Sequence, residues 1–118
     1  MSSLKRRFTS NVLAYLKAEG IDRAELARRS GVSESMLSRL INEERAPTLD
    51  TVEKIARGLK IPPAFLLEEQ HGSHADILYL WRVLDGMPEE ERRRIIEDAE
   101  LRRAYLEDPK LRQRVSRR

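Results

Sequence analysis

Five polar residues that could hydrogen-bond to nucleic acid recur at helical spacing in one short segment. They are Glu34, Ser35, Ser38, Arg39 and Asn42. Residues at this spacing lie on one face of an α-helix. Arginine can donate to guanine, glutamate can accept from cytosine, and serine or asparagine can bond a base edge or a phosphate. The face could therefore enter the major groove of duplex DNA, although a merely solvated helix face has the same composition.

The residues around this polar face predict a helix-turn-helix. Leu37, Leu40 and Ile41 lie on the opposite side of the same helix and can pack inward. Gly31 precedes the helix where the chain needs a left-handed residue, and Ala27 is small where two helices would cross. With this turn attached, we favour the DNA-reading interpretation over the solvated face.

The rest of the chain is also expected to be helical. Apolar residues recur at spacings of three and four, and no strand-length alternation occurs. Asp22, Ser33 and Thr48 are predicted N-caps, and Gly20 is a predicted helix stop. The expected helices cover residues 8–20, 22–31, 33–41, 48–59, 63–67, 77–84 and 88–108.

Composition excludes several classes of site. The 118 residues include no cysteine, which excludes disulfides, thiol catalysis and cysteine-ligated metals. The 23 basic and 20 acidic side chains leave a net charge of +3, which permits an anionic partner without requiring one. The parts of a catalytic or metal site are missing, so we expect neither an enzyme nor a cofactor. The chain also has no apolar run of membrane-spanning length, and we expect a cytoplasmic protein.

The segment from Phe8 to Glu69 resembles the Cro/repressor-type helix-turn-helix family of DNA-binding regulators. The order and spacing of five pieces carry the resemblance: Gly20-Ile-Asp-Arg-Ala-Glu-Leu-Ala, Gly31-Val-Ser, Leu37-Ser-Arg-Leu, Arg45-Ala-Pro-Thr-Leu-Asp-Thr-Val and Lys54-Ile-Ala-Arg-Gly-Leu. The resemblance implies an all-α fold of five helices, in which the second and third form the DNA-reading unit. Double-stranded DNA is then the expected partner.

The resemblance also implies roles for individual positions. Bases would be read from the third helix, and phosphates would be held at the start of the second helix and around the loop before the fourth. We predict as base-reading residues Glu34, Ser35, Ser38 and Arg39. We predict as phosphate-contacting residues Arg23, Ser33, Asn42, Arg45 and Thr48.

Three departures from the family pattern stand out. Ser30 occupies a turn position that is usually apolar, which we expect to cost a little stability. Glu43 and Glu44 occupy a loop that is often Gly-Lys, and their charges could weaken non-specific DNA affinity. Leu16 and Ile41 stand where many relatives have a buried Arg–Glu pair, a replacement that is often neutral or stabilising.

The chain is expected to divide into five parts. They are a basic arm at 1–7, the helix-turn-helix domain at 8–69 with its own core, a linker at 70–74, a helical dimerisation extension at 75–108, and a basic tail at 109–118. His71 and His74 fall in the linker and are interpreted as solvated, since two ligands make a poor metal site. The arm could reach along DNA, but a disordered start fits it equally well.

Apolar residues beyond the linker predict an interface. The predicted dimer-interface residues are Ile77, Leu80, Trp81, Leu84, Leu101 and Tyr105. We expect a homodimer, because short operators are read by two-fold dimers, although these faces could instead pack within the chain. The leading hypothesis is a dimeric, sequence-specific transcriptional repressor. The alternative is a protein-interaction module, such as an antitoxin, that binds a protein partner through the extension.

Overall fold

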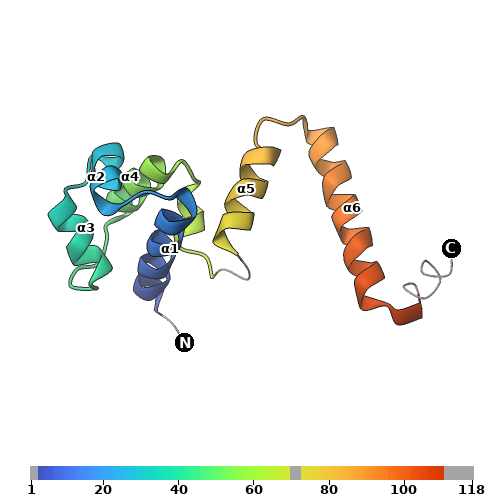
Figure 1. The fold of residues 1–118 in the computed structure, drawn as a ribbon, viewed down its shortest axis with the longest axis horizontal. Coiled ribbons are helices and arrows are strands. Elements are labelled where there is room, and N and C mark those ends of the chain that lie inside the picture. The colour runs from blue at the N-terminus through green and yellow to red at the C-terminus, as the bar shows by residue number, and fades with distance from the viewer. Residues whose placement is uncertain (1–2, 70–72, 111–118) are drawn as a thin grey trace. The chain divides into compact units, whose positions relative to one another are not determined.

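A computed structural model describes residues 3–69 and 73–110 of the chain. The described residues are helical without strands, as predicted (Figure 1). The elements are α1 Leu4–Glu19, α2 Arg23–Ser30, α3 Glu34–Ile41, α4 Leu49–Leu59, a short 3-10 helix η1 Pro63–Leu66, α5 His74–Leu84 and α6 Glu89–Glu107. The predicted fifth helix is thus a single 3-10 turn. No helix in the described ranges is long and apolar enough to cross a membrane.

The predicted caps set the ends of the first four helices. The side chains of Asp22, Ser33 and Thr48 each accept a hydrogen bond from the backbone N–H three residues on. Gly20 and Gly31 end α1 and α2 in the left-handed conformation, with φ of 68° and 77°. Each cap satisfies backbone groups that the helix itself leaves unpaired.

One hydrophobic core holds α1 to α4 and η1 together in a compact unit that runs to Leu80. Its largest fully buried side chains are Tyr15, Phe8, Leu26, Leu37, Ile55, Leu59, Leu66 and Val12. Leu16 and Ile41, where the family resemblance implies a charged pair, are both buried. Leu78 of α5 is also part of this core at 4% exposure. The core therefore includes one residue beyond the predicted domain boundary at residue 69.

Asn11 closes the segment after η1 onto α1. Its Nδ2 donates to the carbonyl oxygens of Leu66 and Glu68, at 2.9 and 2.8 Å. Its Oδ1 lies 2.9 Å from Nε2 of His74, whose ring meets that of Tyr15 edge-on with centroids 5.0 Å apart. The interpretation of His74 as a solvated linker residue is therefore wrong. Burial lowers the pKa of His74 below its ordinary 6.5.

The predicted N-terminal arm is helical over the part that the structure describes. Ser3 caps α1 by accepting from the backbone N–H of Arg6, so Lys5, Arg6 and Arg7 lie in its first two turns. The prediction that these residues form an arm or a disordered start before the first helix is therefore wrong. His71 and positions 111–118 of the predicted tail lie outside the described ranges.

The second compact unit begins at Trp81 and contains the end of α5 and all of α6. The predicted break holds: α5 ends at Leu84, Gly86 has φ of 86°, and α6 begins after Pro88. None of the described side chains in this unit is buried.

The predicted apolar stripe along α5 is only partly inward-facing. Ile77, Trp81 and Leu84 are half-buried, whereas Leu80 is 52% exposed. Leu78, which the predicted stripe does not include, is the one buried residue of α5.

Candidate nucleic-acid interface

The turn between α2 and α3 is fixed by close packing against α4. Ser30 is buried, and its Oγ accepts from the backbone N–H of Val32 at 3.2 Å, so its polar group is satisfied. A Cβ added at Gly58 of α4 would stand 3.0 Å from the Cβ of Ser30 and 3.1 Å from Cδ1 of Leu26. A side chain at Gly58 would therefore require the neighbouring atoms of α2 to shift by a few tenths of an ångström. This contact orients α2, and through the turn it orients α3.

The predicted polar face of α3 is open. Glu34, Ser35 and Arg39 are exposed, and Ser38 is half-buried. No ion pair joins Glu34 or Arg39 to any other residue in the ranges described. Leu37, Leu40 and Ile41 are buried on the other side, as the spacing predicts. The structure thus brings together the four predicted base-reading residues on one accessible helix.

The predicted phosphate-contacting residues occupy helix ends and the loop between α3 and α4. Asn42 is the exposed C-cap of α3, and Arg45 is exposed in the loop without an ion pair to a described residue. Thr48 Oγ1 accepts from the N–H of Thr51 and lies 2.9 Å from the Thr51 hydroxyl. Backbone N–H groups at this helix start could hold an anion.

Two further predicted contacts lie at other helix starts. Ser33 caps α3, so its oxygen is already an acceptor for the N–H of Met36 while its hydroxyl proton remains available. Arg23 is half-buried at the first position of α2. The structure therefore places Ser33 at the start of α3 and Arg23 at the start of α2.

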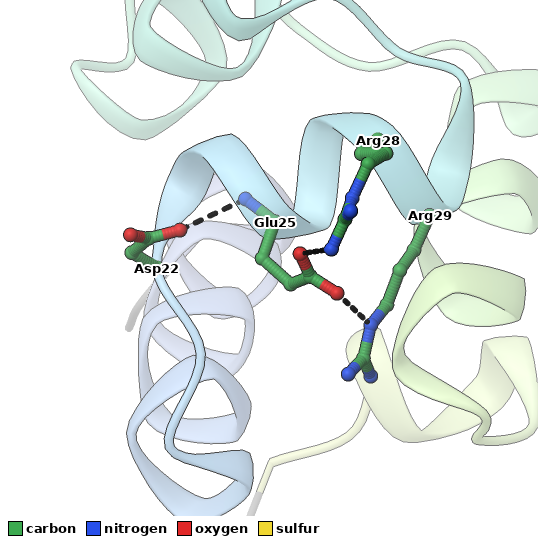
Figure 2. Close-up of polar contacts among 4 residues, drawn as sticks. All are labelled: Asp22, Glu25, Arg28 and Arg29. Carbon is green, nitrogen blue, oxygen red and sulfur yellow. Dashed lines mark hydrogen bonds and ion pairs between the residues drawn. The ribbon is translucent and has the colours of Figure 1, made fainter.

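Figure 2 shows that Arg28 and Arg29 are held within α2 by one carboxylate. Glu25 accepts from Arg29 Nε at 2.9 Å and from Arg28 Nη2, while Asp22 caps the N–H of Glu25 at 2.8 Å. Hydrogen bonds first from Arg29 and then from Arg28 lower the pKa of Glu25. The i,i+3 and i,i+4 spacings could have revealed these pairs. The carboxylate of Glu25 partly neutralises Arg28 and Arg29. These two arginines are therefore weaker candidates for binding phosphate than Arg45.

Lys5, which the sequence places in an arm that could reach along DNA, contacts the loop after α3 instead. Its Nζ donates to the backbone carbonyl oxygen of Glu43, 38 positions away, in the loop after α3. Glu43 itself has φ of 60°, in the left-handed region. The long sequence separation left no local pattern from which the contact could have been inferred.

Comparison with known proteins matches these features to a recognised domain. The helix-turn-helix family model matches residues 12–66. The HTH-type transcriptional regulator SutR of Escherichia coli strain K12 is 40% identical over 57 residues, which are 48% of this chain and 32% of SutR. The chain thus matches about a third of the length of that relative.

A solved structure extends the likeness in fold. A chain of the SinR protein/SinI protein complex is similar with a TM-score of 0.56 at 24% identity, over 82% of this chain and 98% of that chain. At this identity the similarity supports the fold alone. The matched sequence, the capped turn and the open face of α3 all indicate a helix-turn-helix. Residues 12–66 are therefore similar to the helix-turn-helix family in sequence, and the structure shows the helix-turn-helix fold there.

Proposed function

We propose that this protein is a sequence-specific double-stranded-DNA-binding transcriptional regulator, acting as a homodimeric repressor on an operator of two half-sites. The observation that carries the proposal is the exposed polar face of α3, presented by a turn whose glycine, caps and core match the sequence pattern. Glu34, Ser35, Ser38 and Arg39 contact bases. Arg23, Ser33, Asn42, Arg45 and Thr48 contact phosphates. This is a binding function, and it uses no catalytic group.

The second unit supports the homodimer. α6 is a 19-residue helix without a buried side chain, and Ile96 and Leu101 are 53% and 69% exposed. Most helices draw their stability from packing an apolar face, so a helix of this kind requires a partner surface. A second copy would supply it, and two tethered recognition helices would read half-sites about 34 Å apart.

A different set of exposed residues, on α5, favours the second candidate, a protein-interaction module. Tyr79, Leu80 and Val83 of α5 are 72%, 52% and 40% exposed, which is a large apolar surface for one short helix. In this alternative the chain binds a protein partner through α5, as an antitoxin would, and it can also bind DNA. Sedimentation of the pure full-length chain separates the candidates, because a stable homodimer forms without any partner.

Selection from random duplex DNA by the full-length protein, read by sequencing, tests the function. We expect one enriched motif. On that motif Arg39→Ala should cost about 1–3 kcal/mol and relax the preference at one position. Arg57→Ala, which removes an exposed arginine from the last turn of α4, is the matched control and should leave the preference unchanged. Absence of any enriched sequence, or equal binding of Arg39→Ala to selected and random DNA, would contradict the proposal.

A further inference from the structure

The end of α3 is tied to α1 by two side chains. Lys5 Nζ donates to the carbonyl oxygen of Glu43, at 2.5 Å. The Thr9 hydroxyl, which has a single proton, lies 3.1 Å from the carbonyl oxygen of Lys5 and 3.3 Å from that of Leu40. Thr9 is buried and lies one turn after Lys5 on α1. The carbonyl groups at the end of a helix have no partner within the helix and carry its negative pole. A lysine ammonium is therefore well suited to this position.

Glu43 has a backbone conformation that its residue type disfavours. Its φ is 60°, where the Cβ of an L-residue crowds the following carbonyl and only glycine is unstrained. The N–H of Glu43 donates to Leu40 and that of Glu44 to Arg39, which fold the chain back on α3. The contact from Lys5 falls on the carbonyl of this strained residue. It stabilises a conformation that local preference opposes.

The position of the loop beyond Glu43 depends on that conformation. Asn42 precedes it and Arg45 follows two residues later, and both are exposed. A change of φ at Glu43 would redirect the chain between α3 and α4 and alter where Arg45 points.

We infer that Lys5 is a positioning residue for DNA binding: through the carbonyl of Glu43 it holds the loop after α3 in the conformation that presents Asn42 and Arg45 to the DNA backbone. The inference rests on the proposed DNA-binding function. Lys5 acts through Glu43 and does not itself contact phosphate.

A double-mutant cycle in the full-length protein tests this assignment. Lys5→Met removes the ammonium group, and Glu43→Gly permits the left-handed conformation without strain. We expect Lys5→Met to weaken binding to the selected operator by about tenfold, which is the effect of losing one charge-assisted hydrogen bond. In the Glu43→Gly background the same substitution should cost less than twofold. Glu43→Gln, which removes the charge but keeps the strain, should not rescue Lys5→Met.

A control variant and two contrary results complete the affinity test. Lys17→Met removes an exposed lysine from the last turn of α1 and should change affinity less than twofold. An equal loss from Lys5→Met in both Glu43 backgrounds means a direct DNA contact, and no loss in either means no role; both overturn the inference.

A second arm needs no DNA. NMR coupling constants that report φ at residue 43 should show the left-handed conformation in the wild type, its loss in Lys5→Met, and its return in the Lys5→Met, Glu43→Gly double variant. Suppose that neither the wild type nor the variants select a DNA sequence, but that φ at residue 43 changes as described. The proposed function then fails, while the positioning contact between Lys5 and Glu43 stands. If φ at residue 43 is unchanged in Lys5→Met, the positioning inference fails by itself.

Discussion

Replacing Asn11 with alanine should destabilise the compact unit in which Asn11 contacts Leu66, Glu68 and His74. The Asn11 amide makes three hydrogen bonds: two donated to the carbonyls of Leu66 and Glu68 and one shared with His74. Asn11 is 3% exposed, so alanine would leave two carbonyls poorly solvated. Each unsatisfied buried group costs about 1–3 kcal/mol, and we expect a total loss of about 2–4 kcal/mol. For a unit of this size the midpoint of thermal unfolding should fall by about 10–20 °C.

Far-UV circular dichroism during urea and thermal unfolding measures the effect. Ser10→Ala is the matched control, since Ser10 is exposed on the adjacent position of α1, and it should change stability by less than about 0.5 kcal/mol. His74→Ala removes one of the three bonds and should fall between the two. A loss below about 1 kcal/mol for Asn11→Ala, or one no larger than that of His74→Ala, would refute the claim that the two carbonyl contacts dominate.

Four further outcomes are expected. Arg45→Ala should weaken binding to all DNA sequences alike and reduce the slope of log affinity against log salt by about one unit, which titration at several salt concentrations measures. Because burial lowers the pKa of His74, the folded state binds fewer protons than the unfolded one; stability should be full above pH 6.5 and decline below it. Urea midpoints between pH 5 and 8 should show that decline in the wild type and less of it in His74→Gln. Tyr15→Phe should not destabilise the protein and should raise its thermal midpoint slightly, since the Tyr15 hydroxyl is buried without a partner among the described residues. Leu101→Glu should convert the predicted dimer to a monomer in sedimentation equilibrium, and an unchanged dimer would exclude Leu101 from its interface.

Local chemistry made the helix-turn-helix predictable. Asp22, Ser33 and Thr48 act as caps because each side chain reaches an N–H three residues on, a relation that depends only on nearby sequence. The inward positions of α3 follow from helical periodicity in the same way. The polar face of α3 could therefore be located without knowing the rest of the fold.

Contacts between distant segments were not predictable in this way. His74 looked like a linker residue because its neighbours are polar, yet its partner Asn11 lies 63 positions away. Leu78 was missed because the spacing of Ile77, Leu80 and Leu84 suggested a neighbouring stripe, and only packing against α1 to α4 selects the residue that is buried. Lys5 was assigned to an arm because three consecutive basic residues resemble a flexible tail. Its contact with Glu43 depends on tertiary structure.

The loop after α3 shows how a break in local preference can serve the proposed function. A family that often has Gly-Lys at this loop would have both an unstrained left-handed residue and an added positive charge. Here Glu43 and Glu44 supply strain and two negative charges instead. Sequence-independent affinity depends on the number of phosphates neutralised, so we expect these charges to lower it for every DNA site. If the proposed function holds, a chain with a net charge of only +3 would draw a larger share of its affinity from base contacts on α3 and from a second copy. Weak non-specific binding raises the ratio of operator to competing sites, and that ratio determines how well a regulator finds its operator.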